Sequence, residues 1–246
     1  MFSIVIPTLQ INKKILNMLL AELVSDECIG EIIIIDNSRQ GINYHDDKIK
    51  VIVPSENIYV NSAWNLGVMQ SKYDYVGILN DDLIFPKKFF KSVYNFITTS
   101  NKIGYIGLNT IPKAEEKDFI EYPNDTELKF ISIQTRPLCW GSAVFFARAK
   151  YFVIPEKFKI WCGDDFLFSK SHNYGFTNYA ISNSNVKHLH SLTSNSEDFN
   201  EIKRQDNIYA YLLGIKKHKN IIHHSLFILK YYILLFKKKI FRGIKN

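Results

Sequence analysis

The sequence predicts an α/β protein with a mostly parallel central sheet and flanking helices. Two observations support this fold class. Short β-branched runs alternate with stretches of helical periodicity through the first 108 residues. The run from Glu31 to Ile35 is also apolar without alternation after its first residue, which is typical of a strand buried on both faces. The chain has 246 residues, of which 46% are hydrophobic, and this is enough for a sizeable core.

The expected elements follow one another in a regular order through the first half of the chain. Strands are expected at 2–6, 31–35, 49–53, 75–79 and 103–108, and helices at 11–24, 61–71 and 86–98. Pro86 suits the first turn of the third helix. The second half is less regular. A long polar loop is expected at 111–128, a short helix at 164–173, and a polar, mobile segment at 191–206. Strands are expected at 131–135, 142–147, 176–181 and 185–190.

The positive charge is concentrated at the C-terminal end of the chain. There are 31 Lys and Arg against 24 Asp and Glu, a formal net charge of +7. Residues 207–246 hold nine Lys or Arg and no acidic residue, which leaves the rest of the chain at −2. The sequence therefore predicts a nearly neutral domain at 1–210 and a basic tail at 211–246, and no nucleic-acid partner.

The tail carries an apolar stripe at helical spacing. The stripe is Ile222, Leu226, Leu229, Ile233, Phe236 and Ile240. One interpretation is a basic amphipathic helix lying on an anionic membrane surface. The other is a helix packed on the catalytic domain or on a second subunit of a homodimer. No run approaches the roughly 20 apolar residues of a membrane span.

The expected compartment is the cytoplasm, at the inner face of the cell membrane. The three cysteines, Cys28, Cys139 and Cys162, lie far apart without metal-ligand spacing, which favours reduced thiols. The N-terminus lacks the basic and long apolar regions of a secretory signal.

Polar residues follow the expected strands and point to a site at one edge of the sheet. Pro7 and Thr8 follow the first strand, Asp36 and Asn37 the second, and Asn80-Asp81-Asp82 the fourth. Ligands of open α/β sheets bind at the carboxyl ends of the strands. The adjacent carboxylates repel each other, so a divalent cation such as Mg²⁺ or Mn²⁺ is expected there. The alternative is an ordinary turn with Asp82 as a helix cap.

A second acidic pair, Asp164-Asp165, stands between aromatic residues. Partial burial raises the pKa of a carboxylate and makes it a stronger base, although Asp164 could simply cap the helix that follows. His188 and His190 would face the same side of a strand. They could complete a metal shell, but such a pair taken alone is more often structural.

These pieces, in this order, resemble the family 2 inverting glycosyltransferases of the GT-A fold, of the bacterial polysaccharide and rhamnosyltransferase type. The segments 2–8, 31–38, 57–67 and 79–82 carry the resemblance, with Gly163-Asp164-Asp165 as the acidic-pair motif and a late histidine. It extends over about residues 2–210. It implies a Rossmann-like sheet, and Asn80 departs from the first acidic position of the family's DxD motif.

The resemblance also implies roles for individual residues. Asp165 would be the catalytic base and Asp164 its orienter. Asp82 would bind the metal together with His188 or His190. The nucleotide sugar would contact Pro7, Thr8, Asp36, Asn37, Asn57, Asn65 and Asp81. The acceptor cleft would be lined by Trp140, Gly141, Trp161 and Cys162.

The implied activity is a metal-dependent, inverting hexosyl or deoxyhexosyl transfer. The donor would be a UDP, dTDP or GDP sugar, and the acceptor a hydroxyl of a glycan or lipid-linked molecule in surface polysaccharide synthesis. Mn²⁺ or Mg²⁺ would neutralise the leaving diphosphate, and Asp165 would deprotonate the acceptor.

Three alternative functions are less consistent with the sequence. A nucleotidyltransferase usually has a glycine-rich basic loop after the first strand, which Pro7-Thr8-Leu9-Gln10 lacks. A non-catalytic nucleotide-sugar-binding protein would not need the intact Asp164-Asp165 pair. A nucleic-acid-binding protein is disfavoured because apolar residues separate the basic residues of the tail.

Overall fold

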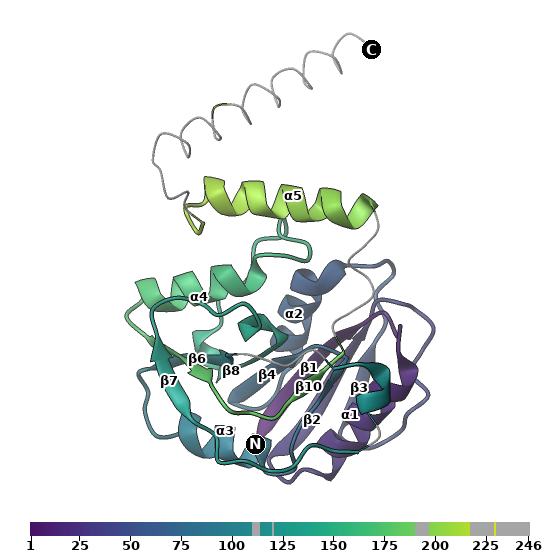
Figure 1. Cartoon of the computed structure of the whole chain (residues 1–246). Coiled ribbons are helices and arrows are strands. Elements are labelled where there is room, and N and C mark those ends of the chain that lie inside the picture. Colours follow the sequence, from purple (N-terminus) through teal and green to yellow (C-terminus); the bar gives the residue numbers. More distant parts are fainter. Residues whose placement is uncertain (110–113, 120, 190–196, 217–228, 230–246) are drawn as a thin grey trace.

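The computed structural model describes residues 1–109, 114–119, 121–189, 197–216 and 229 (Figure 1). Its centre is an eight-stranded sheet in the order β3-β2-β1-β4-β8-β6-β9-β7. The strands are β1 (Phe2–Thr8), β2 (Ile29–Asp36), β3 (Ile49–Ile52), β4 (Tyr75–Leu79), β6 (Ile103–Leu108), β7 (Phe130–Ile133), β8 (Ala143–Ala147) and β9 (Thr177–Ile181). Strands β1 to β4 are mutually parallel, as are β6 and β9, whereas β8 and β7 run against their neighbours. The mostly parallel α/β sheet is confirmed.

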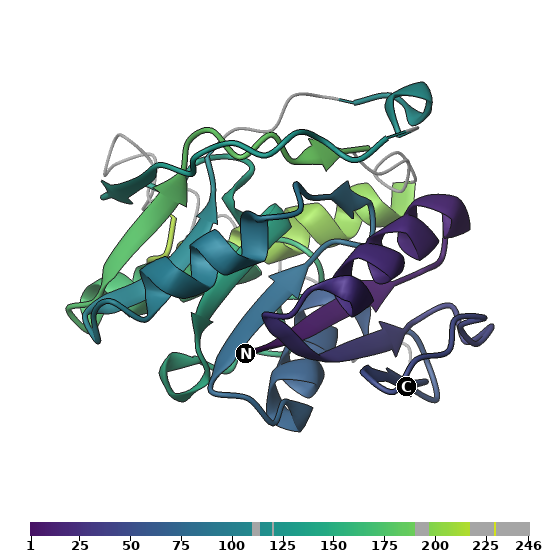
Figure 2. The ribbon, with the colours of Figure 1, turned by 90° about the horizontal axis from the view of Figure 1, so that it is seen from below.

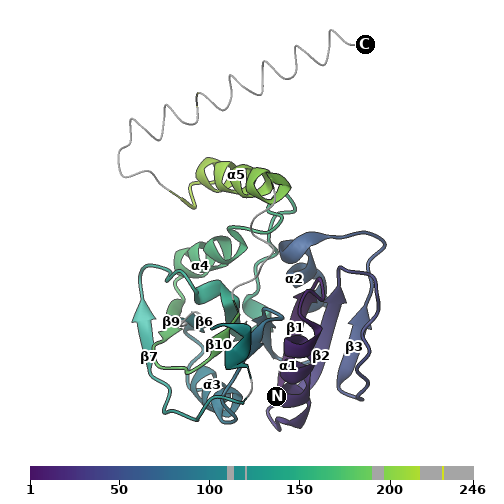
Figure 3. The ribbon, with the colours of Figure 1, turned by 45° about the vertical axis from the view of Figure 1, so that its right-hand side comes forward.

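Helices cover both faces of the sheet. They are α1 (Lys13–Ser25), α2 (Tyr59–Gln70), α3 (Phe89–Ile97), α4 (Gly163–Asn173) and α5 (Glu197–Leu212), with 3₁₀ turns η1 (Glu116–Asp118), η2 (Trp140–Ser142) and η3 (Arg148–Lys150). Helices α1 and α3 lie on one face, as the view from below shows (Figure 2). Helices α2 and α4 pack on the other face, and α5 lies beyond them (Figure 3).

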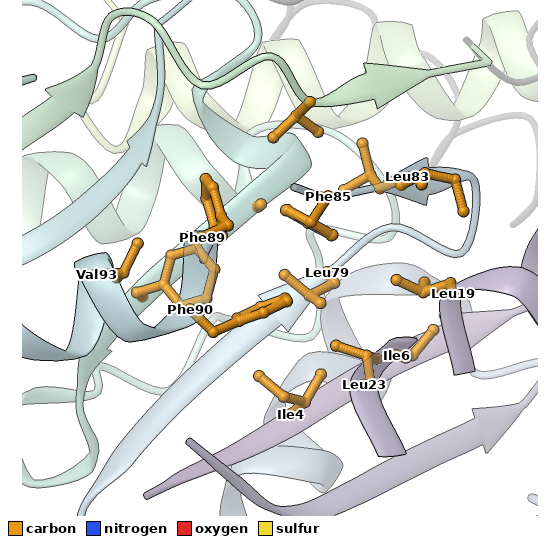
Figure 4. Close-up of a cluster of buried hydrophobic side chains, with 14 of the residues drawn as sticks. Ile4, Ile6, Leu19, Leu23, Leu79, Leu83, Phe85, Phe89, Phe90 and Val93 are labelled. Carbon is orange, nitrogen blue, oxygen red and sulfur yellow. The ribbon is translucent and has the colours of Figure 1, made fainter. Parts of the chain in front are cut away.

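The first core layer holds the acidic turn of the candidate site in place. Apolar residues of α1, α3 and the sheet meet there, and Figure 4 shows Leu79 of β4 and Phe85 among them. Leu79 precedes the Asn80-Asp81-Asp82 turn, and the short strand β5 (Leu83–Ile84) follows it. All of Leu79, Leu83, Ile84 and Phe85 are fully buried. The turn is therefore anchored on both sides by the hydrophobic effect.

Two expectations about helix positions are corrected. Pro86 does not enter α3. Its carbonyl accepts a hydrogen bond from the Phe89 N–H in a separate turn, and the helix begins after that turn. The segment expected to be mobile at 191–206 includes most of α5. Its buried face includes a carboxylate, Asp206, so the hydrophobic pattern did not reveal the helix.

The tail lies largely outside the described residues. Helix α5 runs continuously across the boundary expected at 210/211, and the described chain continues to Lys216. Of the apolar stripe, only Leu229 is described. Within the described part of the chain, no helix has the length and apolarity needed to cross a membrane.

The buried acid Glu22 of α1 makes the stability of the protein depend on pH. Its carboxylate accepts a hydrogen bond from the Phe85 N–H at 3.2 Å, and desolvation raises its pKa from 4.5 to about 8. Between these values the folded chain binds more protons than the unfolded chain, so the free energy of unfolding falls as pH rises from about 4.5 to about 8. The slope is on the order of 1 kcal/mol per pH unit.

We therefore expect Glu22→Gln to stabilise the protein at pH 8 and to have little effect at pH 5. Glutamine keeps an acceptor for the Phe85 N–H but carries no charge to desolvate. Urea unfolding at the two pH values measures the difference, with the exposed Glu27→Gln as a matched control. An equal effect of Glu22→Gln at both pH values would contradict this assignment.

Candidate active site

Polar residues at the ends of β1, β2 and β4 meet at one edge of the sheet. Thr8 and Asp36 are paired residues at the last register position of β1 and β2. The Thr8 hydroxyl donates to Asp81 Oδ2 at 2.5 Å, which joins the end of β1 to the acidic turn after β4. The structure thus brings Pro7, Thr8, Asp36 and Asp81 together, as the sequence predicts.

Asp36 organises the loop that follows β2. It is fully buried and accepts hydrogen bonds from Gln10 Nε2, from the Ser38 backbone and hydroxyl, and from the Gly41 N–H. Burial raises the pKa of Asp36, but the hydrogen bonds outweigh it, and its pKa lies below the ordinary value. Gln10, which also donates to Ser38 and to the Gly41 carbonyl, was missed because no sequence pattern marks it. The contact of Asp36 with a nucleotide base stays a prediction.

Asn37 and Asn57 shape the entry to α2. Asn37 Oδ1 accepts from the Ile58 N–H at 3.2 Å, and Asn57 Oδ1 accepts from the Tyr59 N–H at 2.9 Å. Tyr59 has a left-handed backbone, φ +62°, which these contacts help to hold. Both asparagines lie near the strand-end edge, and their donor contacts stay predictions.

Asn65 fastens a loop to α2. Its amide donates to the Ile154 carbonyl at 2.8 Å and accepts from the Ile154 N–H at 2.9 Å and the Tyr151 hydroxyl at 2.8 Å. The side chain is buried, and both ends of its amide are used to fasten the segment 151–154 to α2. The oxygen and one N–H of the Asn65 amide are thus used inside the protein, and its contact with a nucleotide sugar stays a prediction.

Asp82 and His188 form a buried pair. The short strands β5 and β10 (Lys187–His188) pair antiparallel, with His188 opposite Leu83. His188 Nε2 lies 3.0 Å from Asp82 Oδ1, and the two side chains are 8% and 9% exposed. Apart from this contact, neither carboxylate oxygen of Asp82 has a hydrogen-bond partner among the described residues. A buried carboxylate with so few partners is costly, and a cation would offset that cost.

The donor set fits a divalent cation. One carboxylate and one imidazole are oxygen and nitrogen ligands of the kind that Mn²⁺ accepts. Among the described residues, no cluster of three or more His, Cys, Asp and Glu could hold a metal, and Asp82 and His188 are a contacting pair of such residues. His190 lies outside the described residues.

Asp81 adds to the negative charge of this turn. Desolvation raises its pKa to about 6, the Thr8 hydroxyl lowers it, and the charge of Asp82 raises it. Adjacent partly desolvated carboxylates of this kind are stabilised in their charged form by a nearby cation.

The acidic pair stands at the start of α4. Cys162 precedes the helix with φ +63°, and Gly163 packs so closely on the Asn61 side chain that a Cβ has no room. Asp164 Oδ1 accepts the Asp165 N–H at 2.9 Å, but Asp164 is the second residue of α4, and the residue at the N-cap position is Cys162. The alternative interpretation, in which Asp164 caps a helix that starts at residue 165, is therefore wrong. The local backbone therefore fixes both carboxylates in the first turn.

The 140–142 turn joins the two acidic regions. The Asn80 N–H donates to the Ser142 carbonyl at 2.9 Å. A Cβ on Gly141 would collide with the Asp164 carboxylate, so Gly141 lies directly against the acidic pair. The Asn80-Asp81-Asp82 turn and Asp164 of the acidic pair thus border the same short segment.

Two cations, Arg136 and Lys216, neutralise the acidic pair. Arg136 contacts Asp164 Oδ2 at 2.8 Å and Asp165 Oδ1 at 2.6 Å, and Lys216 Nζ lies 3.2 Å from Asp165 Oδ2. Both cations were missed. Arg136 stands in a loop without a motif, and Lys216 was assigned to the tail.

The cations change the predicted acidity of the pair. Burial raises the pKa of Asp165, but Arg136 and Lys216 outweigh it and hold the pKa below the ordinary value. Burial raises the pKa of Asp164 above the ordinary value despite Arg136. The expectation that burial raises the pKa of both carboxylates is therefore wrong for Asp165, which is the charged member and can accept a proton.

The predicted acceptor residues divide into two groups. Trp140 is fully buried, and its indole donates to the Tyr179 carbonyl at 2.9 Å, so it belongs to the core and its predicted place in a cleft is corrected. Cys162 is also buried, and desolvation raises the pKa of its thiol to about 12. Trp161 is half-buried, with Lys203 Nζ 4.4 Å from its ring centre. The roles of Gly141 and Trp161 in an acceptor cleft stay predictions.

Comparison with known proteins agrees with this geometry. The sequence model described as "Glycosyl transferase family 2" matches residues 3–154. No curated protein matches the sequence.

Two solved structures have a similar fold. S. aureus TarS 1–349, also solved with UDP-GlcNAc, has a TM-score of 0.57 at 16% identity, over 92% of this chain and 68% of that one. GalNAc-T7, solved with UDP, GalNAc and Mn²⁺, has a TM-score of 0.60 at 12% identity, over 84% of this chain and 48% of that one. The matched family segment covers more than half of the chain and contains the whole acidic turn. This chain belongs to glycosyl transferase family 2 and has the GT-A fold.

Proposed function

We propose that this glycosyltransferase is metal-dependent and inverting, and that it transfers a sugar from a nucleoside-diphosphate sugar to a hydroxyl. The observation that carries the proposal is the pairing of two acidic centres across the 140–142 turn. One centre has the buried Asp82–His188 pair, and the other has the charged Asp165. A bound cation would stabilise the charge of the leaving diphosphate, and a charged carboxylate could accept the proton of the acceptor, so the two centres together support the proposal.

The donor site would lie at the ends of β1, β2 and β4. Thr8, Asp36 and Asp81 are held there by the hydrogen bonds described above, with Pro7, Asn37 and Asn57 around them. The TarS and GalNAc-T7 structures hold UDP-GlcNAc and UDP, which supports a UDP sugar as the first donor to test. The dTDP and GDP sugars are the other candidates.

Asp82 and His188 would hold the divalent cation, Mn²⁺ or Mg²⁺. The partly unpartnered, buried carboxylate of Asp82 supports this assignment, and GalNAc-T7 was solved with Mn²⁺. When bound, the cation supplies charge neutralisation of the leaving diphosphate.

Asp165 would accept the proton of the acceptor hydroxyl. Arg136 fixes Oδ1 at 2.6 Å, and Lys216 contacts Oδ2 at 3.2 Å. The hydroxyl must replace one of these contacts. Lys216 has the longer contact and is 33% exposed against 17% for Arg136, so Oδ2 is the oxygen that the acceptor would reach. Attack from the face opposite the leaving group inverts the anomeric centre.

A panel of UDP, dTDP and GDP sugars tests this function. The protein is incubated with each donor and Mn²⁺, with simple sugar acceptors, and release of the nucleoside diphosphate is measured. We expect release from at least one donor that stops when the metal is chelated. Pyrophosphate formation from a nucleoside triphosphate and a sugar phosphate would instead support a nucleotidyltransferase.

The acceptor is proposed to be a glycan or a lipid-linked molecule of surface polysaccharide synthesis, reached by a protein bound to the inner face of the cell membrane. The apolar and basic sequence of residues 221–246 supports a surface-bound tail. The full chain should sediment with anionic phosphatidylglycerol vesicles, and a chain ending at residue 220 should not. Lys216 is kept in that variant, so donor binding should be unchanged. A stable dimer of the full chain that the truncation abolishes would favour the subunit interpretation instead.

A further inference from the structure

Asp206 of α5 is a buried carboxylate with an unusual set of partners. It is 1% exposed and accepts hydrogen bonds from the backbone N–H groups of three consecutive residues. The distances are 3.1 and 3.2 Å from Lys159, 2.9 Å from Ile160 and 2.8 Å from Trp161. A carboxylate aligned with several amides makes strong, charge-assisted bonds. It fixes the direction of the backbone segment that it binds.

The segment 159–161 leads directly into the acidic pair. On its other side, Asn61 of α2 donates its backbone N–H to the Lys159 carbonyl at 3.0 Å and its amide to the Trp161 carbonyl at 3.2 Å. Cys162 and Gly163 then start α4, with Asp164 and Asp165 in its first turn. Asp206 binds the N–H groups and Asn61 the carbonyls of this segment, and Trp161, the last residue that they hold, stands four residues before Asp165.

The next residue of α5 reaches the same site. Asn207 Oδ1 accepts from Lys216 Nζ at 2.8 Å and lies 3.8 Å from Cys162 Sγ. Lys216 in turn contacts Asp165. The placement of α5 by Asp206 therefore also sets one of the two cations on the candidate base.

We propose that Asp206 is a positioning residue for Asp165, acting through the 159–162 segment and through the placement of Lys216. This inference rests on the proposed function, because Asp165 is taken as its base. It assigns a catalytic contribution to α5, which lies outside the family-matched residues 3–154.

The test compares Asp206→Asn with Glu201→Gln, a matched carboxylate-to-amide change on the exposed face of α5. In the wild type Oδ2 accepts from all three amides and Oδ1 from Lys159 alone. An asparagine with its oxygen at the Oδ2 position loses the negative charge, and its NH₂ then opposes the Lys159 N–H. We expect Asp206→Asn to lower kcat by about 10- to 100-fold, to change the Kd of UDP in Mn²⁺ less than twofold, and to leave the variant folded. Glu201→Gln should match the wild type in all three.

The pH profile separates positioning from simple support of the fold. The charged and titratable groups that contact or neighbour Asp165 are Asp164, Arg136, Lys216 and Cys162. If Asp206→Asn displaces Arg136 and Lys216 from Asp165, the pKa of Asp165 should rise. The acid limb of the pH profile of kcat should then move to higher pH in this variant. If that variant does not fold, Asp206→Glu, which keeps the charge on a longer side chain, is measured in the same way and should show a smaller change in the same direction. A folded variant with wild-type kcat and pH profile would overturn the inference.

Amide hydrogen exchange gives a readout that does not need activity. Protection of the Ile160, Trp161 and Asp165 amides should fall at least tenfold in Asp206→Asn beyond any global change in stability. If the wild type transfers no sugar, the proposed function fails. The exchange measurement still tests whether Asp206 positions the 159–162 segment. Unchanged protection at all three amides would overturn the positioning role.

Discussion

Replacing Asp165 by asparagine should abolish sugar transfer while donor binding persists. Asparagine keeps the size of the side chain and can still accept from Arg136, but it cannot take a proton from the acceptor hydroxyl. General-base catalysis contributes about 10²- to 10⁴-fold, so a loss of that order in kcat is expected. The donor residues at the ends of β1, β2 and β4 are separate from Asp165, so the Kd of the nucleotide in Mn²⁺ should stay within twofold of the wild type.

The control for this variant is Asp47→Asn, an exposed aspartate before β3 that should transfer at the wild-type rate. The kcat of Asp164→Asn should lie between those of the wild type and Asp165→Asn, because Asp164 binds Arg136 and accepts the Asp165 N–H but is not the proposed base. A folded Asp165→Asn variant that keeps most of its transferase activity would remove Asp165 from the mechanism.

Asp82→Asn should remove the dependence of donor binding on metal. The change is isosteric, but it takes away the charge of the carboxylate that lies 3.0 Å from His188 Nε2. Titration of UDP in the presence of Mn²⁺ should give a Kd at least 100-fold weaker than the wild type, close to the value without metal. That ratio corresponds to about 2.7 kcal/mol of binding free energy.

The thermal stability of Asp82→Asn provides an independent measure. The buried carboxylate of the wild type has few partners, so its removal should leave Tm without metal unchanged or raised. Wild-type Tm should rise when Mn²⁺ and UDP are added together, and the variant should not respond. A variant that binds UDP with the same metal dependence as the wild type would show that the cation is held elsewhere.

Much of the fold follows from short-range sequence patterns. Continuous β-branched runs such as 31–35 mark buried strands, and the strand-end positions of Asp36 and Asp81 follow from parallel topology. The acidic turn and the Asp164-Asp165 pair could be found because their residue types stand together in the sequence.

The rest of the site depends on contacts between distant parts of the chain. Arg136 and Asp165 are 29 residues apart, and Asp206 binds amides 45 to 47 residues before it. No periodicity marks these partners, because each is a single polar residue in a loop or on a mostly polar helix. The predicted place of Trp140 in the acceptor cleft was wrong for a different reason. An aromatic residue beside a motif can face a ligand or the core, and only the hydrogen bond to Tyr179 and its complete burial decide the question.

The most direct test of the account is calorimetric titration of UDP, dTDP and GDP into the wild-type protein with and without Mn²⁺. The account predicts that at least one of these nucleotides binds at least tenfold more tightly when Mn²⁺ is present, and that chelation of the metal reverses the gain. Equal affinity with and without Mn²⁺ for all three, or no binding of any, would contradict a metal-dependent nucleotide-sugar transferase.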